Sequence, residues 1–239
     1  MFIFYSLVFF CTNIFANDNI SVHVAVSSNF LPAIKSIVKE FEDQSSCKVI
    51  VSSDATSILY NKIIRGAPFE VFISADAKHP MLLEDVNTKS HFYCYGSLVL
   101  FTPNLKYCKN ILRKIITVKY LALANISLSP YGYFANEVFN NLKFAHKNLV
   151  YGLNITNVFN FIRIGSDCIG FVALSQVITS LIDTKMYWLL PVYLYGEIEQ
   201  RFIVLKKIDS NLCLLKFLNY FISDNAKQIM IMYGYKVTE

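Results

Sequence analysis

The stretch "VAVSSNFLPAI", residues 24–34, joins an apolar run to a polar turn and then to a helical pattern. The β-branched residues of "ISVHVAV" predict a strand over residues 20–26. Pro32 suits the first turn of a helix, and apolar residues then recur at helical spacing at Ile34, Ile37, Val38 and Phe41. The turn between them, residues 27–29, holds three small neutral side chains and no charge. It therefore offers hydrogen-bond donors at the start of a helix.

The same strand, polar loop and helix recur along the chain. Apolar β-branched runs predict further strands at 47–53, 69–76, 96–102, 119–127, 168–174 and 200–207. Helical periodicity predicts helices at 31–44, 55–66, 132–142, 158–165, 175–182 and 212–234. Gly66 suits a helix C-terminus, and Pro80 opens a short helix. This alternation indicates an α/β protein with mostly parallel sheets.

Composition limits the class of protein. The chain has 239 residues, enough for one large domain or two small ones, and a net charge of +5 without a dense basic run. We therefore expect no nucleic-acid partner. The apolar start "MFIFYSLVFFCTNIFA", residues 1–16, is too short to span a membrane and resembles a secretory signal cut after Ala16. We expect export to the periplasm and a monomer there.

Sequence patterns of enzymes and metal sites are missing. The chain contains no phosphate-binding loop, no dinucleotide fingerprint and no serine-hydrolase elbow, and its four histidines lie far apart. Glu197 and Glu199 lie two residues apart, which we interpret as a structural or surface pair. Loss of Cys11 leaves five cysteines without a C-x-x-C motif, so most are expected to be buried. One disulfide is possible in an oxidising compartment, but its partners cannot be assigned. We therefore expect a protein that is not an enzyme and needs no cofactor.

Three polar loops without a basic residue carry the functional signal instead, at residues 27–29, 52–57 and 127–132. In open parallel sheets such loops lie at the carboxyl ends of strands, where ligands bind. Helix N-termini there present free N–H groups and partial positive charge, which favour an anion. The alternative is simple helix capping, because Ser, Thr, Asn and Asp are common caps.

The loops and their surroundings resemble the periplasmic molybdate-binding proteins of ABC transporters (ModA type). The most specific match is "GAPFEVFISAD", residues 66–76, and weaker matches keep the family's order from Ile20 to Tyr235. The resemblance implies a class II periplasmic-binding-protein fold, with two α/β lobes joined by two crossover strands. By analogy, residues 17–97 and 200–239 form lobe one, and residues 98–199 form lobe two.

The resemblance also implies a site. Molybdate or tungstate would lie between the lobes, and molybdenum would enter only as this oxyanion, held by Ser28, Asn29, Thr56, Tyr131 and Ile155. Tyr131 and Ile155 would contribute backbone N–H groups. The implied partners are an inner-membrane ABC permease and its ATPase. Another oxyanion, such as sulfate or phosphate, is the alternative ligand.

Two positions depart from the family pattern. Ala173 replaces a tyrosine that some members use as a ligand, so Asn29 is expected to compensate. Asp54 stands where the family has a small neutral residue, and a carboxylate beside a dianion would repel it. We expect Asp54 to point away from the anion and to cap the next helix.

Overall fold

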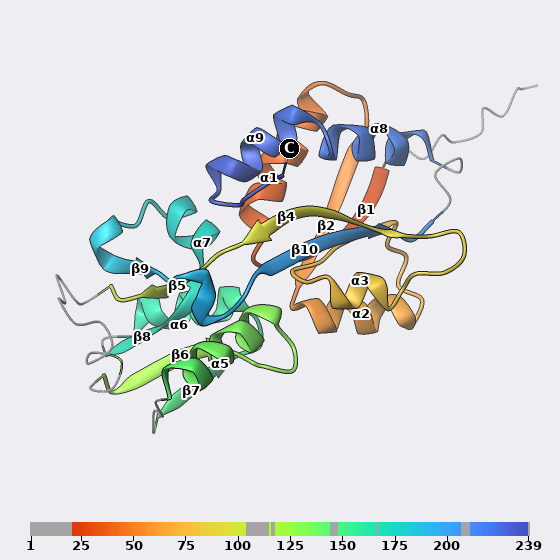
Figure 1. Cartoon of the computed structure of the whole chain (residues 1–239). Coiled ribbons are helices and arrows are strands. Elements are labelled where there is room, and N and C mark those ends of the chain that lie inside the picture. The colour runs from red at the N-terminus through yellow and green to blue at the C-terminus, as the bar shows by residue number, and fades with distance from the viewer. Residues whose placement is uncertain are drawn as a thin grey trace, which may run out of the picture.

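The computed structural model describes residues 21–103, 115, 118–143, 148–165, 167–206 and 211–238. Within them the chain forms two α/β lobes, each built on a sheet of five strands (Figure 1). The expected signal segment and two of the cysteines, Cys11 and Cys108, lie outside the described residues. Among the described helices, none has the length and hydropathy that a membrane span requires.

The first sheet has the strand order β2-β1-β3-β10-β4. Strand β1 (Ser21–Ser27) pairs in parallel with β2 (Lys48–Asp54) and β3 (Val71–Ile73). Strand β10 (Ile198–Val204) runs antiparallel to β3 and to β4 (Ser90–Gly96). The helices of this lobe are α1 (Leu31–Asp43), α2 (Thr56–Ile64), α3 (Lys78–Met81), α8 (Leu212–Phe221) and α9 (Asp224–Met232).

The second sheet has the order β7-β6-β8-β5-β9. Strand β6 (Tyr120–Ala124) is parallel to β7 (Leu149–Gly152) and β8 (Cys168–Ala173), whereas β5 (Leu98–Phe101) is antiparallel to β8 and β9 (Tyr187–Leu189). Its helices are α5 (Pro130–Leu142), α6 (Ile155–Ile164) and α7 (Leu174–Thr179), with short 3-10 turns η1 (Thr184–Met186) and η2 (Val192–Leu194).

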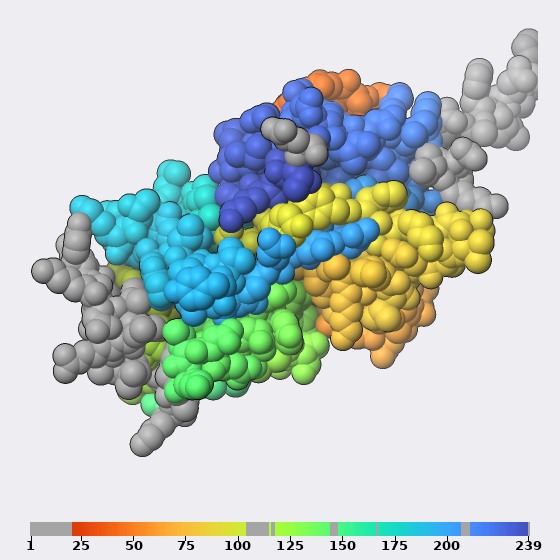
Figure 2. Space-filling model, in the orientation of Figure 1, coloured from red at the N-terminus to blue at the C-terminus, as the bar shows by residue number. Residues whose placement is uncertain are grey.

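Two extended segments connect the lobes. Strand β4 continues into β5 through Ser97, and β10 returns from η2 to the first sheet. In Figure 2 the yellow and light-blue atoms of these segments lie side by side across the visible face. The two-lobed fold is confirmed. Each sheet is mixed, because β10 pairs antiparallel with β3 in the first sheet and β5 pairs antiparallel with β8 in the second.

Aromatic packing fixes the chain directly after the first polar turn. Phe30 is fully buried, and its ring centroid lies 5.0 Å from that of Tyr93 and 5.1 Å from that of Tyr235, both edge to face. Such pairs add about 0.5–1.5 kcal/mol beyond the area they bury. The backbone next to Asn29 is therefore held between β4 and the C-terminal segment.

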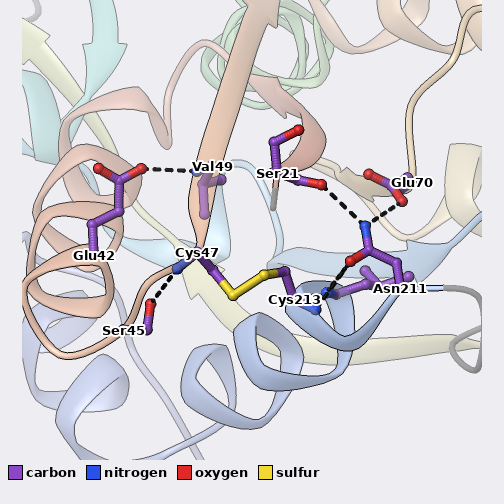
Figure 3. Close-up of a disulfide and its surroundings, with 9 residues drawn as sticks. Ser21, Glu42, Ser45, Cys47, Val49, Glu70, Asn211 and Cys213 are labelled. Carbon is purple, nitrogen blue, oxygen red and sulfur yellow. Dashed lines mark hydrogen bonds between the residues drawn. A yellow bond between two sulfur atoms is a disulfide. The ribbon is translucent and has the colours of Figure 1, made fainter. Parts of the chain in front are cut away.

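A disulfide joins Cys47, directly before β2, to Cys213 in α8. The two residues are 166 positions apart in the sequence, so the bond ties the beginning of the first lobe to the end of the chain (Figure 3). Next to it Asn211 accepts hydrogen bonds from the backbone N–H groups of Cys213 and Leu214, which caps α8. All four described cysteines are buried, as expected, and the one disulfide that the sequence left unassigned joins Cys47 to Cys213, while Cys94 and Cys168 are free.

The last predicted helix, residues 212–234, is two helices instead of one. The first ends at Phe221, and Ser223 caps the second, because its hydroxyl accepts from the N–H of Ala226. Strands β4, β7 and β9 have no counterpart among the predicted strands, except that the prediction at 96–102 touches the end of β4.

Candidate functional site

The five predicted site residues lie where strands end and helices begin. Ser28 and Asn29 follow β1, Thr56 is the first residue of α2, Tyr131 is the second of α5, and Ile155 is the first of α6. All five are buried, and Ser28 is the most exposed of them at 7%. The carboxyl ends of β1, β2, β6 and β7 thus supply the loops, as expected for a ligand site in parallel sheets.

Capping does not explain the polar side chains of the three loops. The N-cap residues of α1, α2 and α5 are Phe30, Ala55 and Ser129, and none of them caps its helix with a side-chain hydrogen bond. The interpretation of residues 27–29 as a simple cap is therefore wrong. Only α6 follows that pattern among these four helices, since Asn154 accepts from the N–H of Asn157 at 3.0 Å.

Backbone N–H groups at these helix starts remain unpaired. Within the described part of the chain, no acceptor pairs with the backbone N–H of Asn29, Thr56, Tyr131 or Ile155. First-turn N–H groups have no partner inside their own helix and carry partial positive charge, which applies to Thr56, Tyr131 and Ile155. Asn29 lies in the turn before α1, which begins at Leu31. These four residues therefore supply donors suited to an oxyanion.

The hydroxyl of Thr56 belongs to a short chain of hydrogen bonds. The backbone N–H of Ala75 donates to Ser27 Oγ at 3.1 Å, and Ser27 Oγ lies 2.7 Å from Thr56 Oγ1. Either hydroxyl can be the donor in this pair, and in one arrangement Ser27 donates its hydrogen to Thr56 Oγ1. The hydrogen of Thr56 is then free to be donated outward.

Asn29 is held by residues that sequence reasoning missed. Its side-chain amide contacts Gln200 at 3.0 Å and the Tyr235 hydroxyl at 3.3 Å. Its backbone carbonyl accepts from the hydroxyls of Ser175 and Tyr235, each at 2.8 Å. These partners are 146 to 206 positions away in the sequence, and no local pattern marks them.

The two lobes touch one another through this site. Ser57 donates its N–H to the carbonyl of Leu128 and its hydroxyl to the carbonyl of Ser127, both at 3.1 Å. On the other side Ser175 donates to Asn29, and Thr156 donates to Ser28 at 3.5 Å. The structure is therefore a closed form, in which both lobes surround the predicted site residues.

The carboxylate of Asp54 is paired with neighbouring residues of its own lobe and does not cap the helix. One carboxylate oxygen accepts from the N–H of Ala55 at 2.9 Å, and the other lies 3.0 Å from Lys62 Nζ. Ala55 occupies the N-cap position, so the capping part of the prediction is wrong. The ion pair with Lys62 offsets the charge of the carboxylate.

A cavity of about 510 Å³ opens beside the site, between α2, α3 and α5. Its lining includes Ser57, His79 and Asp76, with Ser57 Oγ 3.0 Å from His79 Nε2 and His79 Nδ1 2.7 Å from Asp76 Oδ2. This is the connectivity of a catalytic triad. However, the Ser57 hydroxyl also reaches the Ser127 carbonyl and its N–H bonds to Leu128, so Ser57 is engaged in the contact between lobes.

The site residues are neutral and so are their hydrogen-bond partners. Burial raises the pKa of Tyr93, Tyr131 and Tyr235 above the ordinary tyrosine value, so these hydroxyls keep their protons. Among the residues that the structure describes, no three His, Cys, Asp or Glu side chains are grouped to hold a metal ion. The neutral side chains and unpaired N–H groups of the site can donate hydrogen bonds to an anion.

Comparisons with known proteins identify the family of this chain. The family profile of the bacterial extracellular solute-binding proteins matches residues 22–236. The molybdate-binding protein ModA of Azotobacter vinelandii is 34% identical over 228 residues, which cover 90% of this chain and 89% of that protein. ModA of Rhodobacter capsulatus is 32% identical over 91% of this chain and 88% of its own length.

Solved structures show the same fold. The periplasmic molybdate-binding protein of Azotobacter vinelandii superposes with a TM-score of 0.82 at 24% identity, over 91% of this chain and all of that one (100%). The sulfate-binding protein SubI from Mycobacterium tuberculosis H37Rv gives a TM-score of 0.68 at 13% identity, over 92% of this chain and 87% of that one. At these identities the structural likeness establishes the fold alone.

Proposed function

This chain belongs to the bacterial extracellular solute-binding proteins, in the family of the molybdate-binding proteins ModA, and we propose that it binds molybdate or tungstate in the cleft between its lobes. Ser28, Asn29 and Thr56 would donate from side chains. Tyr131 and Ile155 would donate from backbone N–H groups. The single observation that carries the proposal is the set of unpaired N–H groups at helix starts from both lobes.

Neutral donors suit a fully deprotonated dianion. A lysine or arginine would add attraction, but it would also attract phosphate and sulfate. A site made only of donors disfavours an anion that carries an O–H, because that hydrogen would meet another donor and find no acceptor. Sulfate shares the charge and shape of molybdate, so it would be rejected by the size of the closed site.

Ligand binding would be coupled to lobe closure. Each lobe supplies part of the donor set, so only the closed form offers all of the donors at once. A ligand that contacts both lobes therefore shifts the open–closed equilibrium by its differential affinity for the closed form.

The proposal includes the transport role. A signal over residues 1–16 would direct export, and the mature monomer would deliver its anion to an inner-membrane ABC permease and its ATPase. Residues 17–97 with 200–239 would move as one lobe and residues 98–199 as the other. The disulfide between Cys47 and Cys213 supports an oxidising location, because disulfides persist there.

Calorimetric titration tests the proposed function. The mature protein is titrated with molybdate, tungstate, sulfate and phosphate. We expect binding heat with the first two at low-micromolar protein, and no heat with either oxyanion would refute the proposal. Tight sulfate or phosphate binding in place of molybdate would establish the alternative ligand.

The Ser57–His79–Asp76 arrangement favours one alternative, an esterase-like enzyme. We propose that it is not catalytic, because the hydrogen bonds of Ser57 to the second lobe occupy the groups a nucleophile would use. Assays with acetyl and phosphoryl esters check this. Turnover that disappears in Ser57→Ala would establish the enzymatic alternative.

A further inference from the structure

A buried glutamine sets the orientation of the Asn29 side chain. Gln200 is fully buried on β10, and its amide contacts three residues around the site. One amide atom lies 2.8 Å from the Tyr93 hydroxyl and 3.0 Å from the Asn29 amide, and the other lies 3.4 Å from the Tyr131 hydroxyl. In the structure the atom that faces Tyr93 is Oε1.

The single hydroxyl hydrogen of Tyr93 indicates that the oxygen and nitrogen of the Gln200 amide should be exchanged. The Tyr93 hydroxyl lies 2.8 Å from the Ser74 carbonyl oxygen as well as 2.8 Å from Gln200. A hydroxyl has one hydrogen, and a carbonyl oxygen can only accept, so the hydrogen belongs to the contact with Ser74. The Gln200 atom that faces Tyr93 must then be the donor, Nε2. Amide oxygen and nitrogen differ little in size, so a rotation of 180° makes the exchange without other movement.

The exchange at Gln200 also requires the side-chain amide of Asn29 to rotate, because the two amides are hydrogen-bonded. If Gln200 donates from Nε2 to Asn29, then Asn29 must turn its oxygen towards Gln200. In the unrotated arrangement Asn29 Oδ1 is a buried acceptor that has no donor among the described residues. After rotation Nδ2 takes that position, where its N–H groups have no acceptor among the described residues. Tyr131 in turn donates its hydroxyl to Gln200 Oε1.

One contact favours the unrotated Asn29. Its Nδ2 lies 3.3 Å from the Tyr235 hydroxyl. That contact is longer than the Tyr93 pair at 2.8 Å, and Tyr235 already donates to the Asn29 carbonyl at 2.8 Å. Because hydrogen bonds weaken with length and a buried mismatch is costly, the shorter contacts decide the orientation.

We propose that Tyr93 and Gln200 are positioning residues, which hold Asn29 with its NH₂ group towards the bound oxyanion. The proposal rests on the proposed function only in naming the anion. The opposite orientation would present an oxygen, which repels a dianion and accepts from an anion that carries an O–H. The chain Ser74–Tyr93–Gln200–Asn29 therefore makes the site selective for a fully deprotonated oxyanion.

Gly96 leaves room for this arrangement. A Cβ atom at Gly96 would lie 2.3 Å from the Tyr131 hydroxyl and 2.4 Å from the Gln200 side-chain nitrogen. These distances are too short for any Cβ. The absence of a side chain at Gly96 therefore leaves space for the Tyr131 hydroxyl and the Gln200 amide at the end of β4.

Nuclear magnetic resonance tests the orientation directly. With ¹⁵N-labelled glutamine, we expect the Gln200 NH₂ protons to show cross-relaxation to the ring protons of Tyr93. Cross-relaxation to the Tyr131 ring instead would overturn the proposal. The measurement is read with and without molybdate, so it stands even if the wild-type protein binds no molybdate and the proposed function fails.

Tyr93→Phe tests the consequence for binding, with Tyr95→Phe on the same strand as the matched control. Without the Tyr93 hydroxyl, Gln200 is no longer fixed, so its NH₂ signals should contact both rings. Molybdate affinity should fall about fivefold, the value of one net hydrogen bond. In competition against molybdate at about pH 8, the affinity of the variant for hydrogen phosphate should rise relative to its affinity for sulfate. Unchanged affinity with a single Gln200 orientation in Tyr93→Phe would contradict the proposal.

Discussion

Replacement of Thr56 by valine removes one hydroxyl from the proposed anion site and keeps the shape of the side chain. Thr56 is 1% exposed and opens α2, so the β-branched valine can occupy the same space. Ser27 loses the acceptor that lies 2.7 Å from its hydroxyl, but it still accepts from Ala75. We therefore expect a small loss of unfolding free energy, about 1 kcal/mol.

The loss of anion affinity should be larger than the loss of stability. The Thr56 hydroxyl would donate to a charged oxygen, and such a hydrogen bond contributes about 1.5–3 kcal/mol. Each 1.4 kcal/mol is about tenfold in Kd, so molybdate should bind roughly 10 to 150 times more weakly. The hydrogen bond from Ala75 through Ser27 polarises this donor, which favours the upper part of the range.

Calorimetry measures this effect against two controls. Thr56→Ser keeps a hydroxyl and should bind within a few-fold of the wild type. Ser53→Ala removes an exposed hydroxyl from the same loop and should change nothing. If Thr56→Val binds molybdate within twofold of the wild type, Thr56 is not a ligand and the assignment of this loop is wrong.

The remaining predictions concern stability, closure and pH. Replacement of Cys47 and Cys213 by serine should lower the unfolding free energy by about 2–5 kcal/mol, measured by urea denaturation without reductant, and an unchanged midpoint would show that the bond is dispensable. Gly132→Ala would place a Cβ 2.3 Å from the Ala124 carbonyl oxygen and push α5 off β6, so molybdate affinity should fall at least about tenfold. Ser57→Ala removes a hydrogen bond between the lobes, so small-angle scattering should detect a larger open fraction without ligand. Molybdate affinity should stay constant between about pH 7 and pH 9, because burial raises the pKa of Tyr93, Tyr131 and Tyr235 and these hydroxyls keep their protons. Above about pH 10 the free energy of unfolding should fall, because these tyrosines ionise more readily in the unfolded chain than in the folded one.

The sequence predicted the parts of the fold that depend on local patterns. Apolar periodicity located β1, α1 and α2, and the polar loops after the strands placed Ser28 in the turn after β1 and Thr56 at the start of α2, as the structure has them. The family resemblance supplied the order of the lobes. Short strands such as β9, with three residues, carry too little periodicity to be recognised.

The network around Asn29 was not predictable from local patterns. Gln200 and Tyr235 approach it only because the last strand and the C-terminal segment return to the first lobe. The pairing of Cys47 with Cys213 has the same origin, since 166 positions separate them. Such contacts depend on tertiary packing, and a single sequence contains no separate signal for them.

A crystal structure of the protein with molybdate, with the metal located by its anomalous scattering, tests directly whether neutral donors hold the anion. We predict a molybdenum peak between the starts of α1, α2, α5 and α6, within hydrogen-bond reach of Asn29 and Thr56 and without a basic side chain in contact. A peak in the neighbouring cavity, beside Lys78 and His79, would contradict the claim that neutral donors hold the anion.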